Sequence, residues 1–241
     1  MILDVPPSID CCFHIASTNN MMLNDTIQIP VAGAAAPLEG QLQLPSDEAG
    51  LCLFVHGSGS SRFSPRFVAD HLNRHGIGSL LLDLLTPDEE AQDEITRALR
   101  FDIPFLARRV VEVIDHLQMY DPTRQRPLVL FGASTGSAAA IIAASERSQL
   151  VRCVVSRGGR PDLVPSAILH AVQQPSLFIV GGNDTEVLKM NRSALDMLGA
   201  REKHLEVVPH ATHLFEEAGA LEQVASLTSN WCLQHHMDRR Q

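Results

Sequence analysis

A serine stands between two glycines in the segment GASTG (residues 132–136), directly after the apolar run 128–131. Small residues at helical spacing follow this segment. A G-x-S-x-G segment between a strand and a helix is typical of a sharp turn that lifts the serine hydroxyl above a sheet, where it can attack an acyl carbon. The same residues also suit a plain tight turn. Ser134 is therefore a candidate nucleophile, whose role depends on finding a base.

An acid and a histidine occur later in the chain, in the order that such a nucleophile needs. Asp184 follows the apolar run 176–180, and His213 follows the run 204–208. A serine hydroxyl is a poor nucleophile at neutral pH, so it needs a general base, which an acid orients. The order Ser134, Asp184, His213, with each residue just past a predicted strand, predicts a catalytic triad.

Other interpretations of these residues are open. Asp184 also suits a turn or a helix cap before the helix predicted at 187–199. His210 and His213 form an H-x-x-H pattern, but no cysteine or carboxylate has the spacing to complete a metal site, so no metal is expected. We select His213 as the base because it stands where a loop meets a helix, and we leave His210 as a surface histidine.

An oxyanion hole is expected from two loops. The run 51–55 leads into HGSGSS (residues 56–61), whose glycines allow unusual backbone angles. The backbone N–H near Ser58 and that of Thr135, directly after the nucleophile, are the predicted donors. For His56 a structural role at the end of the strand is favoured over a catalytic one.

Four arginines follow the predicted strands in two loops: Arg62, Arg66, Arg157 and Arg160. Both loops are expected to border the same crevice. Guanidinium groups pair bidentately with carboxylate or phosphate, so Arg62, Arg66 and Arg157 are candidate substrate-binding residues. The alternative is ion pairing with acids such as Asp83 or Asp162.

The elements that must position these residues alternate along the chain. Short apolar runs predict strands buried on both faces, at 51–55, 79–82, 128–131, 151–155, 176–180 and 204–208. Helices are predicted between them, at 65–75, 88–98, 102–119, 135–147, 187–199 and 218–235. This alternation indicates an α/β fold with a doubly wound, mostly parallel sheet flanked by helices, which binds ligands beyond the carboxyl ends of its strands.

Two details complete the predicted fold. Residues 26–32 and 38–44 are expected to form an antiparallel hairpin, the second strand alternating between apolar and polar residues. Ser64 and Pro65 are interpreted as a helix N-cap and first helical residue. Residues 1–24 are expected to be an irregular leader, and 25–241 a single domain.

Composition limits the partners. The chain has 241 residues, a net charge of −9, one Trp and one Tyr, which argues against a nucleic-acid or anionic membrane partner. Its five cysteines are odd in number and scattered, which favours a reducing, cytoplasmic location. The N-terminus lacks the features of a secretory signal. A homodimer is left open.

Five segments resemble the α/β-hydrolase superfamily, and within it the dienelactone-hydrolase-related group, which includes domains joined to phosphoribosyltransferases. They are HGSGSSRFSPR (56–66), GASTGSAAA (132–140), SRGGRPDL (156–163), VGGNDTEVL (180–188) and PHATHLFEE (209–217). The resemblance implies an α/β-hydrolase fold, with Ser134 as nucleophile, Asp184 as orienting acid, His213 as base and no cofactor.

The candidate nucleophile, Ser134, departs from one branch of this resemblance. Dienelactone hydrolases proper have a cysteine where this chain has Ser134, so an ester or thioester substrate is favoured over dienelactone itself. The expected activity is that of a carboxylic-ester hydrolase acting on a small substrate, with an anionic substrate as one option. Alternatives are an acyltransferase with the same triad and a non-catalytic binding protein of the same fold.

Overall fold

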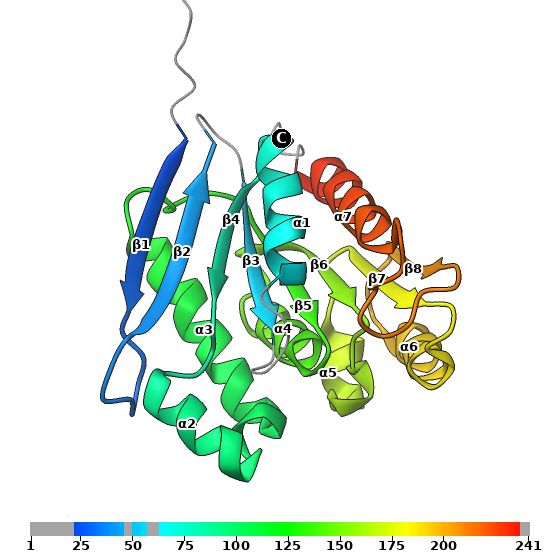
Figure 1. Ribbon diagram of the computed structural model, residues 1–241, viewed down its shortest axis with the longest axis horizontal. Helices are drawn as coiled ribbons and strands as arrows, with labels where there is room; N and C mark the ends of the chain where they lie inside the picture. The colour runs from blue at the N-terminus through cyan, green and yellow to red at the C-terminus, as the bar shows by residue number, and fades with distance from the viewer. Residues whose placement is uncertain (1–21, 46–49, 57–62, 237–241) are drawn as a thin grey trace, which may run out of the picture.

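The computed structural model describes residues 22–45, 50–56 and 63–236, which form a sheet between two helical layers (Figure 1). The strand order is β1-β2-β4-β3-β5-β6-β7-β8. The hairpin β1–β2 joins β4 antiparallel, and all other pairs are parallel. The strands are β1 Leu23–Ile29, β2 Leu38–Leu44, β3 Leu51–His56, β4 Gly78–Leu82, β5 Leu128–Ala133, β6 Val151–Arg157, β7 Ser176–Gly181 and β8 Lys203–Val208.

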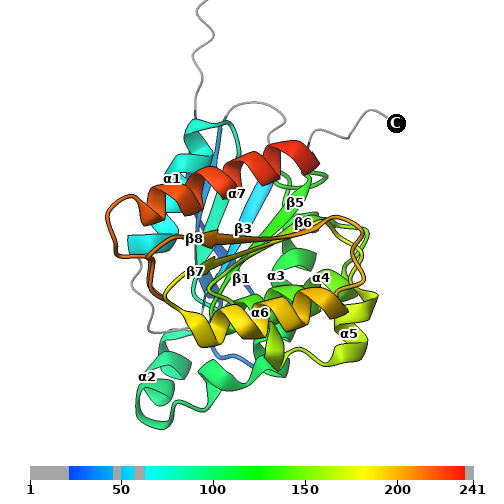
Figure 2. The same ribbon diagram turned by 90° about the vertical axis from the view of Figure 1, so that its right-hand side faces the viewer.

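Helices cover both faces of this sheet (Figure 2). Helices α1 and α7 lie on one face, and α3, α4, α5 and α6 lie on the other. Their bounds are α1 Phe63–Arg74, α2 Pro87–Thr96, α3 Ile103–Met119, α4 Thr135–Glu146, α5 Ser166–Ala171, α6 Thr185–Met197 and α7 Ala220–His236. Two short 3-10 turns, Leu99–Phe101 and Pro161–Leu163, complete the set.

Each face of the sheet has its own apolar core. One core joins β2 and β4 to α3 and α4, and the other joins β3, β5 and β6 to α1 and α7. Every residue of β5 and of β7 is buried, which explains why these strands are continuously apolar in sequence. Because β5, β6, β7 and β8 are parallel neighbours, their carboxyl ends lie at the same edge of the sheet, and the loops that follow them are close together.

The predicted hairpin and the doubly wound sheet are confirmed, with two corrections at element ends. The first strand begins at Leu23 rather than at residue 26, because Leu23 pairs with Leu44 at the far end of β2. Leu23 and Asn24 therefore belong to the sheet and not to the predicted leader 1–24, of which residues 1–21 lie outside the described residues. Helix α1 begins at Phe63, so the interpretation of Ser64 as its N-cap is wrong. Pro65 still fits the first turn, whose N–H groups have no intrahelical acceptor.

No helix in the described part of the chain is long and apolar enough to cross a membrane.

Candidate active site

Ser134 occupies a strained turn between β5 and α4. Its φ is 51° and its ψ is −125°, a conformation that costs a non-glycine residue about 1–3 kcal/mol. Gly132 makes the turn possible, because a Cβ there would lie 2.4 Å from Cα of Ser137 in α4. Ser134 stands at the N-cap of α4, yet its side chain makes no capping hydrogen bond. The Ser134 hydroxyl therefore does not cap the helix and is available for another role.

The backbone N–H and carbonyl of Ser134 are both hydrogen-bonded. The N–H of Ser134 donates to the carbonyl of Arg157 at 3.3 Å. Its carbonyl accepts from the N–H groups of Ser137 and Arg160, each at 3.1 Å, and from the Ser137 hydroxyl at 2.9 Å. These bonds hold the backbone of Ser134 in the strained conformation.

His213 and Asp184 form a short hydrogen bond, with 2.6 Å between Nδ1 and Oδ2. Asp184 follows β7 at the N-cap position of α6, but its carboxylate makes no cap bond and turns to His213 instead. The Asp184 side chain is 16% exposed and that of His213 is 39% exposed. A carboxylate at Nδ1 holds the imidazole in the tautomer that leaves Nε2 able to accept a proton.

The loop that carries His213 is held at several points. His210 and Phe215 have positive φ values of 62° and 58°. The Asn183 side chain donates to the His210 carbonyl at 2.8 Å. The N–H of Thr212 donates to Glu217 at 2.9 Å, and hydrogen bonding by Thr212 lowers the pKa of that carboxyl group.

Gly158, directly after β6, packs against the imidazole of His213. Its φ is +52°, and a Cβ there would lie 3.4 Å from Cε1 of His213. Two adjacent glycines after a predicted strand, Gly158 and Gly159, are the signal in the sequence for such a close approach.

The predicted oxyanion donors are only in part within the described residues. Thr135 is the first residue of α4 and is buried, and its N–H belongs to the helix turn that has no intrahelical acceptor. This N–H is suited to a developing negative charge beside Ser134. Ser58 lies outside the described residues, as does Arg62, while His56 ends β3.

Arg157 ends β6 and is 8% exposed. Its Nη2 donates to the carbonyl of Leu214 at 2.7 Å, and its guanidinium lies 4.9 Å from the ring centre of Phe215. Burial lowers the pKa of Arg157 to about 10. Within the described residues Arg157 forms no ion pair, whereas Arg160 pairs with Asp162 through two contacts of 2.8 Å.

A cavity of about 430 Å³ adjoins these residues. Its wall includes Ala133 and Leu214, the chain neighbours of Ser134 and His213, together with Pro65, Phe67 and Arg157. The volume is in the range of small-molecule sites. Ser134 and His213 themselves do not line the cavity, and Glu216, Glu217 and Glu222 also contribute to its wall.

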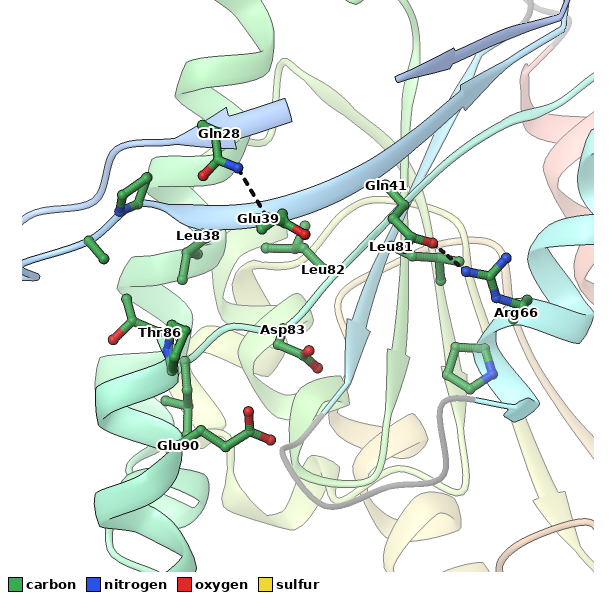
Figure 3. A pocket seen from close by; sticks show the side chains of 15 residues that line it. Gln28, Leu38, Glu39, Gln41, Arg66, Leu81, Leu82, Asp83, Thr86 and Glu90 are labelled. Atoms are coloured by element: carbon green, nitrogen blue, oxygen red, sulfur yellow. Dashed lines mark hydrogen bonds between the residues drawn. The ribbon is translucent and has the colours of Figure 1, made fainter. Parts of the chain in front are cut away.

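Arg66 lies in a different cavity from Arg157, between β2, the end of β4 and α2 (Figure 3). This second cavity measures about 480 Å³. Arg66 is exposed and donates to the side chain of Gln41. The carboxylates of Asp83 and Glu90 point into the same space.

No group of three or more His, Cys, Asp or Glu side chains that could hold a metal occurs among residues 22–45, 50–56 and 63–236. His210, the other histidine of the H-x-x-H pattern, is exposed.

No protein-family model matches the chain. It is 46% identical over 210 residues to curated proteins of two Mycobacterium tuberculosis strains that are provisionally named phosphoribosyl transferases. The match covers 86% of this chain but 46% of theirs, so the chain spans about half the length of these relatives.

Solved structures resemble the chain over nearly its whole length. A dienelactone hydrolase from Anabaena variabilis is 45% identical, with a TM-score of 0.85, and the match covers 89% of this chain and 99% of that one. Carboxyl esterase 2 from the fungus Tuber melanosporum is 14% identical, with a TM-score of 0.68, and the match covers 91% and 90% of the two chains. The second likeness is one of fold.

Proposed function

Because this chain belongs to the dienelactone-hydrolase-like group of the α/β-hydrolase superfamily, we propose that it is a serine hydrolase that cleaves a carboxylic ester or thioester of a small molecule. The observation that carries the proposal is the 2.6 Å bond between His213 and Asp184, at the same sheet edge as the strained Ser134. This pairing gives an imidazole a fixed tautomer, which is what a serine nucleophile requires.

The proposed reaction proceeds in two halves. His213 Nε2 takes the proton of the Ser134 hydroxyl while the serine oxygen bonds to the acyl carbon. The N–H of Thr135, with a second donor near Ser58, stabilises the negative oxygen of the tetrahedral intermediate. That intermediate collapses, the bond to the leaving group breaks, and His213 protonates the leaving alcohol or thiol. Water then repeats the sequence on the acyl-enzyme.

The substrate is expected to lie in the cavity of about 430 Å³ beside Ala133 and Leu214. Apolar side chains such as Phe67 and Leu221 contribute to its wall, so we propose a short, largely apolar acyl or alcohol group there. A carboxylate on the substrate stays a prediction of the sequence, as does a homodimer. Comparing neutral with carboxylate-bearing esters tests the first, and the mass in solution tests the second.

The name of the mycobacterial relatives belongs to proteins about twice as long, so this proposal rests on the site and not on that name. We also propose a cytoplasmic location, because Cys52, Cys153 and Cys232 are buried and unpaired, as thiols of a reducing compartment are.

Hydrolysis of p-nitrophenyl acetate and butyrate by the wild type and by Ser134→Ala tests the proposal, together with labelling by a fluorophosphonate. Turnover and labelling should both vanish in Ser134→Ala, while Ser145→Ala, far from the turn in the same helix α4, keeps both. A folded wild type that is not labelled would overturn the proposal and leave a binding protein of this fold. Labelling with product formed only when an acceptor alcohol is present would point to acyl transfer.

A further inference from the structure

Arg157 contacts both sides of the proposed catalytic centre. Strand pairing places it beside Ala133 of β5, and its carbonyl accepts the N–H of Ser134 at 3.3 Å. Its side chain reaches in the other direction and donates to the carbonyl of Leu214 at 2.7 Å. Leu214 directly follows His213. One residue therefore connects the turn of the nucleophile to the loop of the base.

The contact of Arg157 with Phe215 supports the same loop. Phe215 is 1% exposed and has a φ of 58°, which a bulky side chain adopts only where its surroundings enforce it. The guanidinium lies 4.9 Å from the centre of the Phe215 ring, at the distance of a cation–π contact. The planar guanidinium can cover an aromatic face and donate in its own plane at the same time.

We propose that Arg157 is a positioning residue, which holds the loop of His213 so that the imidazole stays bonded to Asp184 and directed toward Ser134. This inference rests on the proposed function, since it concerns the base of the proposed triad. It differs from the expectation drawn from the sequence, in which Arg157 binds an anionic group of the substrate. A residue that binds such a group would discriminate between substrates, whereas a residue that holds His213 affects them all equally.

The kinetic test compares Arg157→Met, Arg157→Lys and a matched control, Arg152→Met, which changes an exposed arginine of the same strand. We expect kcat to fall at least 30-fold in Arg157→Met with KM within twofold. The fall should be equal for p-nitrophenyl butyrate and for a p-nitrophenyl ester that bears a carboxylate. Lysine keeps the charge and one donor, so Arg157→Lys should recover part of kcat. If Arg157→Met does not fold, the same measurements are made on Arg157→Lys.

A spectroscopic test separates this inference from the proposed function. The Cε1–H resonance of His213 can be followed in protein labelled at histidine and assigned by its loss in His213→Gln. In Arg157→Met it should move toward its position in the unfolded protein while Tm changes by a few degrees, and in Arg152→Met it should stay in place. If the wild type hydrolyses no ester but the His213 resonance still moves in Arg157→Met, the proposed function is refuted and the inference stands.

Three results would overturn the inference. One is a His213 resonance that does not move in folded Arg157→Met. Another is unchanged kcat for the neutral ester. The third is a rise in KM confined to the carboxylate-bearing ester, which would restore Arg157 as a substrate-binding residue.

Discussion

Replacing Asp184 by Asn tests the proposed triad with little disturbance of the fold. The substitution exchanges one carboxylate oxygen for an amide nitrogen of similar size. Asp184 stands at the N-cap of α6 without a side-chain cap bond, so the helix loses no hydrogen bond and at most about 1 kcal/mol of charge–dipole attraction. The backbone N–H of Asp184, which donates to the Gly181 carbonyl at 3.1 Å, is unaffected. The change therefore falls on the 2.6 Å contact with His213.

The expected loss of activity follows from that contact. The Asn amide can donate to Nδ1, which leaves the proton on Nε2 and removes the lone pair that must accept the proton of Ser134. In a well-studied Ser-His-Asp triad the same exchange lowers kcat about 10⁴-fold. The Asp184 side chain is 16% exposed, so water screens its charge weakly. We expect kcat to fall about 10³- to 10⁴-fold, or about 4–5.5 kcal/mol of transition-state stabilisation.

The assay is hydrolysis of p-nitrophenyl butyrate, with Tm measured on the same samples. Glu186→Gln is the matched control, because it removes an exposed acid from the first turn of the same helix, where Glu186 pairs with Lys189. Both variants should melt within about 4 °C of the wild type, as expected for a change below about 1 kcal/mol. An Asp184→Asn enzyme within tenfold of the wild type in kcat would refute the argument that Asp184 orients His213.

Two further substitutions test the framework around the site. Gly132→Ala should cost more than about 3 kcal/mol of unfolding free energy in urea, because its Cβ would lie 2.4 Å from the Ser137 backbone. The control Gly33→Ala meets only open space at a φ of +75° and should cost about 1–2 kcal/mol. Equal losses in the two variants would contradict this reasoning. Asp115→Asn should cost about 0.5 kcal/mol at pH 7, because hydrogen bonds from Arg147 lower the pKa of Asp115. Because its pKa is lowered in the folded protein, the ionised Asp115 carboxylate stabilises the fold above the ordinary carboxyl pKa, and this stabilisation is lost as the pH falls through the lowered pKa. The difference in unfolding free energy between wild type and Asp115→Asn should therefore disappear in acid. A difference that persists in acid would show that the ion pair is not its cause.

The long elements could be predicted from the sequence because their patterns are strong. Each of the six apolar runs proposed as parallel strands is a strand of the sheet. Helix α5 (Ser166–Ala171) cannot be predicted in this way, since six residues are too few to show a helical period. The start of α1 was misplaced, since Ser64 and Pro65 also fit inside a first helical turn.

The order of the site residues along the chain could be predicted from the sequence, but the contacts between them could not. The fold places the ends of β5, β7 and β8 at one edge, so Ser134, Asp184 and His213 could be grouped by their positions after strands. Arg160 pairs with Asp162, two residues away, which a local pattern can indicate. The bond from Arg157 to Leu214 joins residues 57 positions apart and depends on which strands are neighbours. No local pattern carries that information.

The choice between His210 and His213 gives a final prediction. Asp184 bonds to His213, while the carbonyl of His210 accepts from Asn183 and its exposed side chain is left to solvent. His210 also has a φ of 62°, which Asn adopts readily. His210→Asn should therefore keep kcat/KM within threefold and Tm within a few degrees. His213→Asn should lose more than about 10³-fold in kcat/KM, because no base remains for the serine. A large loss of activity in a folded His210→Asn enzyme would show that His210, and not His213, transfers the proton. The 2.6 Å bond between His213 and Asp184 would then need another role.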